Sequence, residues 1–239
     1  MISKRAAVWG ESHAGNVRKQ NQDRYLVKEL PEIMILAVAD GIAGSPGGEL
    51  ASQIVIDETQ KYNFSPQKIK EDLGMVLVKA EKRIHDTVNK NPDLEGMGTT
   101  AIIVALYKKK VFWIHIGDSR LYLLHSTKIK QITTDHTFIQ DLIDDGSITP
   151  EKAKTHPLKN MLDQCVGCGE AKPDYGVFNM QINDQLLLCS DGLTKHLSDL
   201  QIESILNTNP AQAAVQQLIQ TALKMGGTDN VTVIVKEGN

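Results

Sequence analysis

IMILAVADG, residues 33–41, is the most strongly patterned segment of the chain. Its apolar run over 33–39 is typical of a strand buried on both faces of a sheet. Such a strand needs cover on two sides, so several layers should surround it. The run ends at Asp40, and a carboxylate in that position is costly to bury without a partner. Asp40 is therefore the first candidate functional residue.

The elements predicted around this strand occur in blocks and do not alternate strictly. Helices are expected at about 48–62, at 65–89 after an N-cap at Ser65-Pro66, and at 135–145, with a short one after Thr149. Two more follow a capping box at Ser198 and the pair Asn209-Pro210. Hairpins are predicted for 99–107 with 111–116, 121–125 with 128–132, and 177–182 with 185–189, and a last strand for 231–236. This order predicts fold class α+β, with two stacked antiparallel sheets and helices outside.

The composition is that of an ordinary soluble globular protein, with 239 residues, 41% hydrophobic and 23% charged. The 26 Lys and Arg are balanced by 29 Asp and Glu, so no nucleic-acid surface is expected. No apolar run reaches the length of a membrane span, and the N-terminus MISKR is not followed by the apolar part of a signal peptide. We therefore expect a cytoplasmic protein. No coiled coil or apolar stripe demands a partner, so we expect a monomer.

Several reactive residue types are interpreted as structural. The three cysteines are too few, and odd in number, for a disulfide framework, and they favour a reducing compartment. Cys165 and Cys168 have the spacing of a redox motif, but a zinc site would need a second ligand pair, which is not evident nearby. Arg120 is expected to form an ion pair. His136 is expected to make local hydrogen bonds.

Acids recur where predicted strands end or begin. The segments are VADG at 38–41, GDS at 117–119, CSDG at 189–192 and GGTDN at 226–230. One Asp-Gly pair means little, because the pair is common in turns. If the ends converge, the carboxylates of Asp40, Asp118, Asp191 and Asp229 repel one another, and a cation relieves that repulsion. Oxygen ligands favour Mg²⁺ or Mn²⁺ over Zn²⁺, and the carbonyl of Gly41 could add a ligand.

The loop GNVRKQNQD, residues 15–23, supplies one arginine and one further acid. A guanidinium beside a metal cluster is suited to gripping a phosphate through two parallel hydrogen bonds, which makes Arg18 a candidate. Two metals about 3.5–4 Å apart could activate a water for in-line attack on phosphorus. The acid of this loop is Asp23.

Taken in order, these segments resemble the metal-dependent (PPM, type 2C) Ser/Thr protein phosphatases of the short bacterial type. The matching pieces are Arg18 with NQD at 21–23, VADG at 38–41, GTT at 98–100, GDSR at 117–120, TDH at 134–136, SDG at 190–192 and TDN at 228–230. Each piece alone is common, but the ordered set is specific and spans essentially the whole chain. The resemblance implies a four-layer α-β-β-α sandwich in a single domain over 1–239.

The resemblance also implies a metal centre of two Mn²⁺ or Mg²⁺ ions with a possible third. Asp40 would bridge the two ions, and Gly41 would give its carbonyl to the second. Asp191 and Asp229 would complete the first. Asp118 would join Asp191 at the third, weaker site.

Other positions acquire roles from the same resemblance. Arg18 would bind the substrate phosphate, and Asp23 would hold or orient metal-bound water. Residues 137–165 resemble the mobile flap of the family, and Asn160 falls where the flap approaches the third site. Some relatives have a histidine proposed as general acid just after the Asp-Gly pair, where this chain has Ile42. The identity of a general acid is therefore open.

The predicted function is hydrolysis of phosphoserine or phosphothreonine in proteins by metal-bound hydroxide, without a covalent phosphoenzyme. The expected partners are phosphorylated proteins, the targets of a Ser/Thr kinase. One alternative is a phosphatase for small phosphomonoesters. Another is a non-catalytic binding module on the same fold, which the intact set of aspartates disfavours.

Overall fold

Ten strands form two five-stranded sheets in the computed structural model, which describes residues 8–42, 45–153, 155–169 and 171–238. Every pairing is antiparallel. One sheet contains, in order, β1 (Val8–His13), β10 (Val231–Glu237), β9 (Gln185–Cys189), β6 (Arg120–His125) and β7 (Lys128–Gln131). The other contains β2 (Asp23–Glu29), β3 (Ile33–Asp40), β4 (Ala101–Tyr107), β5 (Lys110–Ile116) and β8 (Asp174–Asn179). The segment MISKR and residues 43–44 lie outside the described residues.

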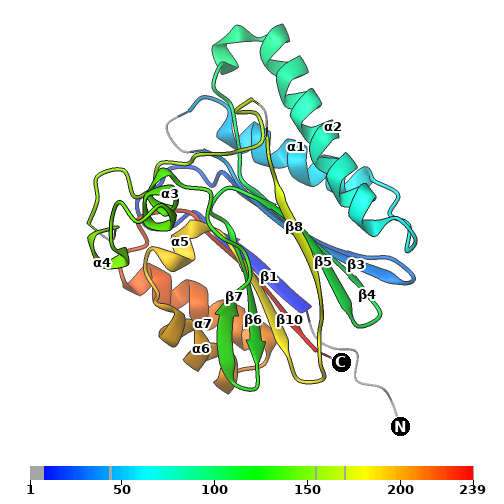
Figure 1. The fold of residues 1–239 in the computed structure, drawn as a ribbon, viewed down its shortest axis with the longest axis vertical. Coiled ribbons are helices and arrows are strands. Elements are labelled where there is room, and N and C mark those ends of the chain that lie inside the picture. The colour runs from blue at the N-terminus through cyan, green and yellow to red at the C-terminus, as the bar shows by residue number, and fades with distance from the viewer. Residues whose placement is uncertain (1–7, 43–44, 154, 170, 239) are drawn as a thin grey trace.

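Helices cover the outer face of each sheet (Figure 1). Helices α1 (Gly48–Lys61) and α2 (Ile69–Lys90), followed by the short 3₁₀ helix η1 (Pro92–Leu94), pack on the sheet that contains β3. Helices α5 (Asp191–Thr194), α6 (Asp199–Thr208) and α7 (Ala211–Lys224) lie over the sheet that contains β10. A third apolar cluster, which includes Leu36, Ile102, Leu188 and Ile234, fills the space between the sheets. The predicted α+β class and four-layer sandwich are confirmed.

Strand β3, which lies between β2 and β4, is buried on both faces, as its apolar run predicts. Its even-numbered residues Leu36 and Val38 face the other sheet, and its odd-numbered residues Ile35 and Ala37 face the helices. The register with β2 places Asp23 opposite Asp40. The acid that begins one strand therefore lies beside the acid that ends its neighbour.

Three predicted features of the local structure are wrong. Residues 177–182 and 185–189 do not form a hairpin, because β8 pairs with β5 and β9 pairs with β10 and β6. Helix α2 begins at Ile69 and not at Ser65, because the Ser65 amide donates to Asp72 Oδ2 at 2.7 Å and the intervening residues form a turn. Helix α3 (Phe138–Asp144) begins after Thr137, because Asp135 is held by Arg120.

The structure adds one cysteine bond to the expectation that the chain has no disulfide framework. Cys165 and Cys168 form a disulfide, with their Cα atoms 5.4 Å apart, whereas Cys189 is free and buried. The bond encloses only two residues, so it is a local link and not a framework. Among the described helices, none combines the length and apolar character that a bilayer crossing requires.

Candidate metal centre and phosphate site

The predicted acids meet in a cleft of about 430 Å³ where the strand ends of both sheets come together. Its lining includes Arg18, Asp40, Gly41, Asp118, Asp191 and Asp229. Asp40 ends β3, Asp191 opens α5 directly after β9, and Asp229 precedes β10. Asn160, Met161 and Leu162 contribute a wall from the segment that carries α3 and α4 (Pro150–Ala153). Asp23 lies behind this lining, against Asp40.

Two glycines follow aspartates because backbone from another segment passes very close. A Cβ on Gly41 would lie 2.3 Å from the carbonyl oxygen of Gly48. A Cβ on Gly192 would lie 1.9 Å from the carbonyl oxygen of Asn230. The second approach brings Asp191 next to the segment that carries Asp229. The Asp-Gly pattern therefore reflects packing at the cleft as well as turn formation.

Asp40 is fixed through its backbone while its carboxylate faces the cleft. Its amide donates to Thr100 Oγ1 at 3.0 Å, and Thr99 Oγ1 donates to its carbonyl at 2.8 Å. Burial raises the pKa of the Asp40 carboxyl well above its usual range, and the charges of Asp23 and Asp191 raise it further. A cation close to Asp40 would stabilise the charged form of this carboxyl.

Asp23 is fully enclosed at the junction of the two sheets. Its Oδ2 accepts hydrogen bonds from Ser190 Oγ and Thr232 Oγ1, both at 2.7 Å, and its Oδ1 has no partner among the described residues. Burial raises the pKa of Asp23 to about 6, against the lowering effect of those two hydroxyls. The carboxyl can therefore change protonation state near neutral pH.

Asp118 lies in the turn between β5 and β6 and is buried. Burial raises the pKa of Asp118 well above the usual range, and the charges of Asp191 and Asp135 raise it further. The next residue, Ser119, exchanges a hydrogen bond with Thr100 at 2.8 Å. This contact ties the turn to β4 close to Asp40.

Arg18 and Lys195 neutralise the exposed side of the acid cluster. Arg18 pairs with Asp229 through Nε to Oδ1 at 2.9 Å and Nη2 to Oδ2 at 3.1 Å. The Lys195 ammonium lies 2.5 Å from Asp191 Oδ2 and 2.7 Å from Asp229 Oδ2. Burial alone would raise the pKa of Asp229, but the bonds and charges of Lys195 and Arg18 lower it. Sequence reasoning missed Lys195, although its i,i+4 spacing from Asp191 could have indicated the pair.

The residues present fit divalent cations. The donors are all oxygens, and both Asp23 Oδ1 and Asp191 Oδ1 are buried without a hydrogen-bond partner in the part of the chain that the structure describes. The only cationic groups that line the cleft within the described ranges are Arg18 and Lys195. Several carboxylates that raise one another's pKa, with lone pairs unused, form a site suited to Mg²⁺ or Mn²⁺.

Arg120 and His136 have structural contacts, as predicted from the sequence. Arg120 donates three guanidinium hydrogen bonds to the Asp135 carboxylate, the shortest at 2.6 Å. His136 exchanges two bonds with Gly117: its amide donates to the carbonyl at 2.8 Å, and its Nδ1 accepts from the amide at 3.3 Å. These bonds hold the turn that carries Asp118.

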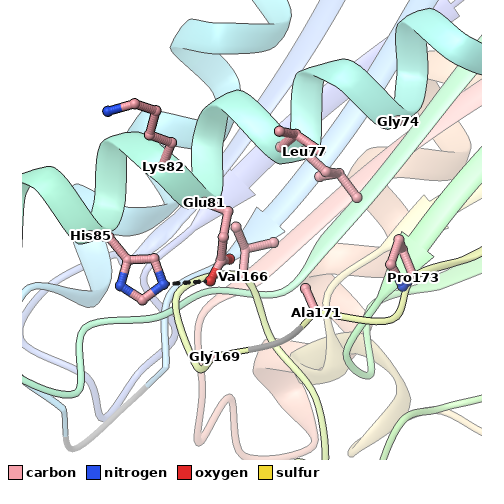
Figure 2. A pocket seen from close by; sticks show the side chains of 10 residues that line it. Gly74, Leu77, Glu81, Lys82, His85, Val166, Gly169, Ala171 and Pro173 are labelled. Atoms are coloured by element: carbon pink, nitrogen blue, oxygen red, sulfur yellow. Dashed lines mark hydrogen bonds and ion pairs between the residues drawn. The ribbon is translucent and has the colours of Figure 1, made fainter.

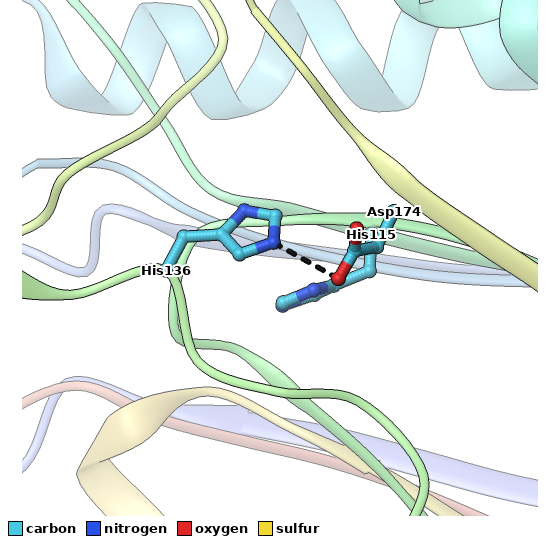
Figure 3. A group of neighbouring side chains, drawn as sticks. All are labelled: His115, His136 and Asp174. Atoms are coloured by element: carbon cyan, nitrogen blue, oxygen red, sulfur yellow. Dashed lines mark ion pairs between the residues drawn. The ribbon is translucent and has the colours of Figure 1, made fainter. Parts of the chain in front are cut away.

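His115, His136 and Asp174 bring three possible metal ligands within 4.8 Å of one another (Figure 3). His136 Nδ1 accepts from Gly117, so its proton belongs on Nε2, which lies 3.3 Å from Asp174 Oδ2. A metal on Nε2 would require that proton on Nδ1, facing an amide hydrogen. The geometry thus favours a hydrogen-bonded pair over a metal site. His115 is buried, neither of its ring nitrogens has a hydrogen-bond partner among the residues that the structure describes, and burial lowers its pKa to about 3.

With this fold and this acid cluster, the chain is of the class of two-sheet metallohydrolases. The family model described as Protein phosphatase 2C matches residues 9–231, and the chain belongs to that family. It is 36% identical over 233 residues to the serine/threonine protein phosphatase PstP of Mycobacterium tuberculosis, covering 95% of this chain. It is 32% identical to the protein phosphatase PhpP of Streptococcus pneumoniae, covering 94% of both chains. The chain spans only 44% of the length of PstP.

Solved structures agree with this assignment. A crystal structure of the M. tuberculosis PstP/Ppp phosphatase superposes with a TM-score of 0.91 at 35% identity, covering 98% of this chain and 99% of that one. The catalytic domain of PstP in complex with two manganese ions gives a TM-score of 0.88 at 34% identity, with 97% of each chain covered. Stp1 of Staphylococcus aureus gives 0.92 at 30% identity, covering 99% of this chain and 96% of that one.

Proposed function

We propose that this chain is a Mn²⁺- or Mg²⁺-dependent phosphatase that hydrolyses phosphoserine and phosphothreonine in proteins. The observation that carries the proposal is the convergence of Asp40, Asp118, Asp191 and Asp229 on one cleft with Arg18 at its mouth. The names of its relatives support the substrate class, and the manganese-bound PstP domain supports the metal.

The metal ligands in this proposal are Asp40, Gly41 through its carbonyl, Asp191 and Asp229, with Asp118 at a third position. When bound, the ions lower the pKa of a water and withdraw charge from the phosphoryl oxygens. Asp40 presents its carboxylate because its backbone is held by Thr99 and Thr100. Asp23 Oδ1 and Asp191 Oδ1, which have no hydrogen-bond partner within the described ranges, supply acceptors on the inner side of the cleft.

Arg18 binds the substrate phosphate in this proposal. Its guanidinium already occupies the cleft mouth and is partly exposed, so it can exchange Asp229 for phosphoryl oxygens in the same two-bond geometry. Asp23 orients the attacking water, and the hydroxyls of Ser190 and Thr232 fix the position of its carboxylate. Ile42 lines the cleft and cannot protonate the leaving oxygen, so water supplies that proton.

Residues 137–165 act as a flap over the cleft in this proposal, within a single domain. Asn160 and Met161 of this segment face the acids across the cavity, where a peptide on either side of the phosphoresidue would contact them. We further propose that the substrates are targets of a Ser/Thr kinase and that the protein acts as a cytoplasmic monomer in signalling. Binding of nucleic acid or membrane is not part of this function.

The test uses Asp40→Asn and Asp191→Asn, with Asp86→Asn as the matched control. Asp86 is an exposed acid on α2 whose partner is Lys82. We expect both cleft variants to lose Mn²⁺-dependent hydrolysis of a phosphothreonine peptide by at least roughly a hundredfold, while the control keeps wild-type rates. Full activity in either cleft variant would refute the proposal. Faster hydrolysis of a sugar phosphate than of the peptide would instead favour the alternative function, a phosphatase for small phosphomonoesters.

A further inference from the structure

The pair Cys165 and Cys168 lies at the edge of the cleft that contains the acids. Cys165 is buried at 1% exposure, whereas Cys168 is exposed and lines the same cavity as Asp40 and Arg18. The two sulfurs are bonded to each other. One sulfur of the bond is therefore open to a molecule in the cleft and the other is protected.

The residues around the disulfide are hydrogen-bonded directly to the end of β3. Val166 and Thr99 exchange two backbone bonds, of 2.9 and 3.0 Å. Thr99 in turn forms a bridge with Gly41, and its hydroxyl donates to the carbonyl of Asp40. Only one residue thus separates the cysteine loop from the two residues proposed to hold metal.

Packing and a helix contact hold the loop on its other sides. A Cβ on Gly98 would lie 2.7 Å from Cys165 Sγ and 3.1 Å from Cys168 Sγ, so the bonded pair rests directly on that glycine. The Gly167 amide donates to Glu81 Oε2 at 2.6 Å. Figure 2 shows Glu81 extending from α2 toward the loop beside Val166, with His85 on the same carboxylate. The disulfide thereby fixes a segment that connects α2 with the catalytic strand end.

We propose that Cys165–Cys168 is a thiol–disulfide exchange site whose state sets the activity of the cleft; this rests on the phosphatase function proposed above. The reactant is a dithiol, of a small molecule or of a protein. Its thiolate attacks Cys168 Sγ, the S–S bond breaks, and Cys165 leaves as a thiolate that takes a proton from water. The second thiol of the reactant then attacks the mixed disulfide and releases Cys168. The protein disulfide gains two electrons and the dithiol becomes a disulfide.

Reduction removes the covalent link but not the two bonds between Val166 and Thr99. Gly167 and Cys168 then move more freely beside Gly98, and the end of β3 is held less firmly. Because small displacements of catalytic groups reduce rates strongly, we expect kcat/KM for a phosphopeptide to fall roughly fivefold on reduction. The oxidised enzyme is the more active form.

The first measurement does not depend on activity. Protein is incubated with dithiothreitol in its reduced and oxidised forms at graded ratios, alkylated with iodoacetamide under denaturing conditions, and weighed by intact-mass spectrometry. We expect one label in the oxidised state, on Cys189, and three in the reduced state. In native reduced protein, Cys168 should be labelled before Cys165 because only Cys168 is exposed. Three labels at every ratio would overturn the proposal.

The second measurement compares kcat/KM of wild type, Cys168→Ser and Cys189→Ala before and after reduction, with dithiothreitol removed before Mn²⁺ is added. Wild type and Cys189→Ala should respond equally, and Cys168→Ser should not respond. An equal rate in both states of the wild type, or a response that survives in Cys168→Ser, would overturn the inference. Reversible pairing in a protein that lacks all phosphatase activity would leave the exchange chemistry standing and refute the proposed function instead.

Discussion

Lys195 occupies the space between two proposed metal ligands. Its ammonium contacts Asp191 and Asp229 and so neutralises carboxylates that would otherwise repel each other. A divalent ion bound by the same oxygens has to displace this ammonium. Lys195 therefore stabilises the metal-free protein and competes with the metal for the same ligands.

Replacing Lys195 by methionine should change two measurements in opposite directions. The melting temperature of the metal-free protein should fall, because Asp191 and Asp229 lose a partner. Mn²⁺ should bind roughly fivefold more tightly, a change of about 1 kcal/mol, because no ion pair has to be broken first. Differential scanning and titration calorimetry give the two values.

Lys128→Met is the control for that experiment, since Lys128 pairs with Glu203 on the surface, with 79% of its side chain exposed. Its Mn²⁺ affinity should equal that of the wild type. Weaker Mn²⁺ binding by Lys195→Met would mean that the lysine supports the metal site and does not compete with it.

At the scale of elements, sequence patterns identified the strands and helices with the strongest periodicity. The buried strand β3, the β4–β5 hairpin, the capping box of α6 and helix α7 are close to their predicted positions. Strands β1 and β2 were missed because both are edge strands with polar residues between the apolar ones. The pairing of β8 was wrong because a local turn at Asn183 says nothing about which sheet each strand joins.

The candidate site was easier to predict than the pairing. Each acid stands beside or near a glycine at a strand end, so its location depends on local sequence, and the cleft collects Asp40, Asp118, Asp191 and Asp229 as expected. Lys195 and the cysteine bond could not be found in this way. Both depend on distances across the fold, and a lysine or a Cys-x-x-Cys pair occurs in many surroundings.

Strand β5 provides a pH test through His115. Burial lowers its pKa in the folded protein to about 3, below the usual histidine value of 6.5, so the unfolded chain binds the proton more readily. The stability due to neutral His115 is therefore complete above pH 6.5 and is lost as the pH falls from 6.5 toward 3. Between pH 6.5 and pH 4, the melting temperature of His115→Leu should fall by less than that of the wild type.

His85→Leu is the control for this pH series, because His85 lies on the outside of α2 with 53% of its side chain exposed. The curve of His115→Leu is compared with the curves of His85→Leu and the wild type. Parallel curves for His115→Leu and wild type would show that His115 does not contribute to acid sensitivity. Thermal scans followed by circular dichroism are sufficient.

For the whole molecule, metal binding should increase the free energy of unfolding. Ligands are drawn from both sheets, so an ion bound at the cleft favours only the folded chain. At a Mn²⁺ concentration of 100 times Kd, the gain is about 2.7 kcal/mol. This corresponds to a rise in melting temperature of roughly 5–10 °C for a domain of this size.

Chelation with EDTA should reverse that rise, and Asp40→Asn should reduce it. Differential scanning calorimetry at fixed protein concentration measures both. An unchanged melting temperature across the Mn²⁺ series would contradict a metal centre in this cleft.

The last strand of the chain lies inside its sheet, between β1 and β9. Ser12 and Thr232, whose hydroxyls are 2.7 Å apart, are separated by 220 positions in the sequence. During synthesis, β1 must therefore wait for about 220 further residues to be made before it can pair with β10. Pairings over such separations form slowly. A nascent chain would present Asp40 without Asp229, so the growing polypeptide should remain catalytically silent until β10 is in place.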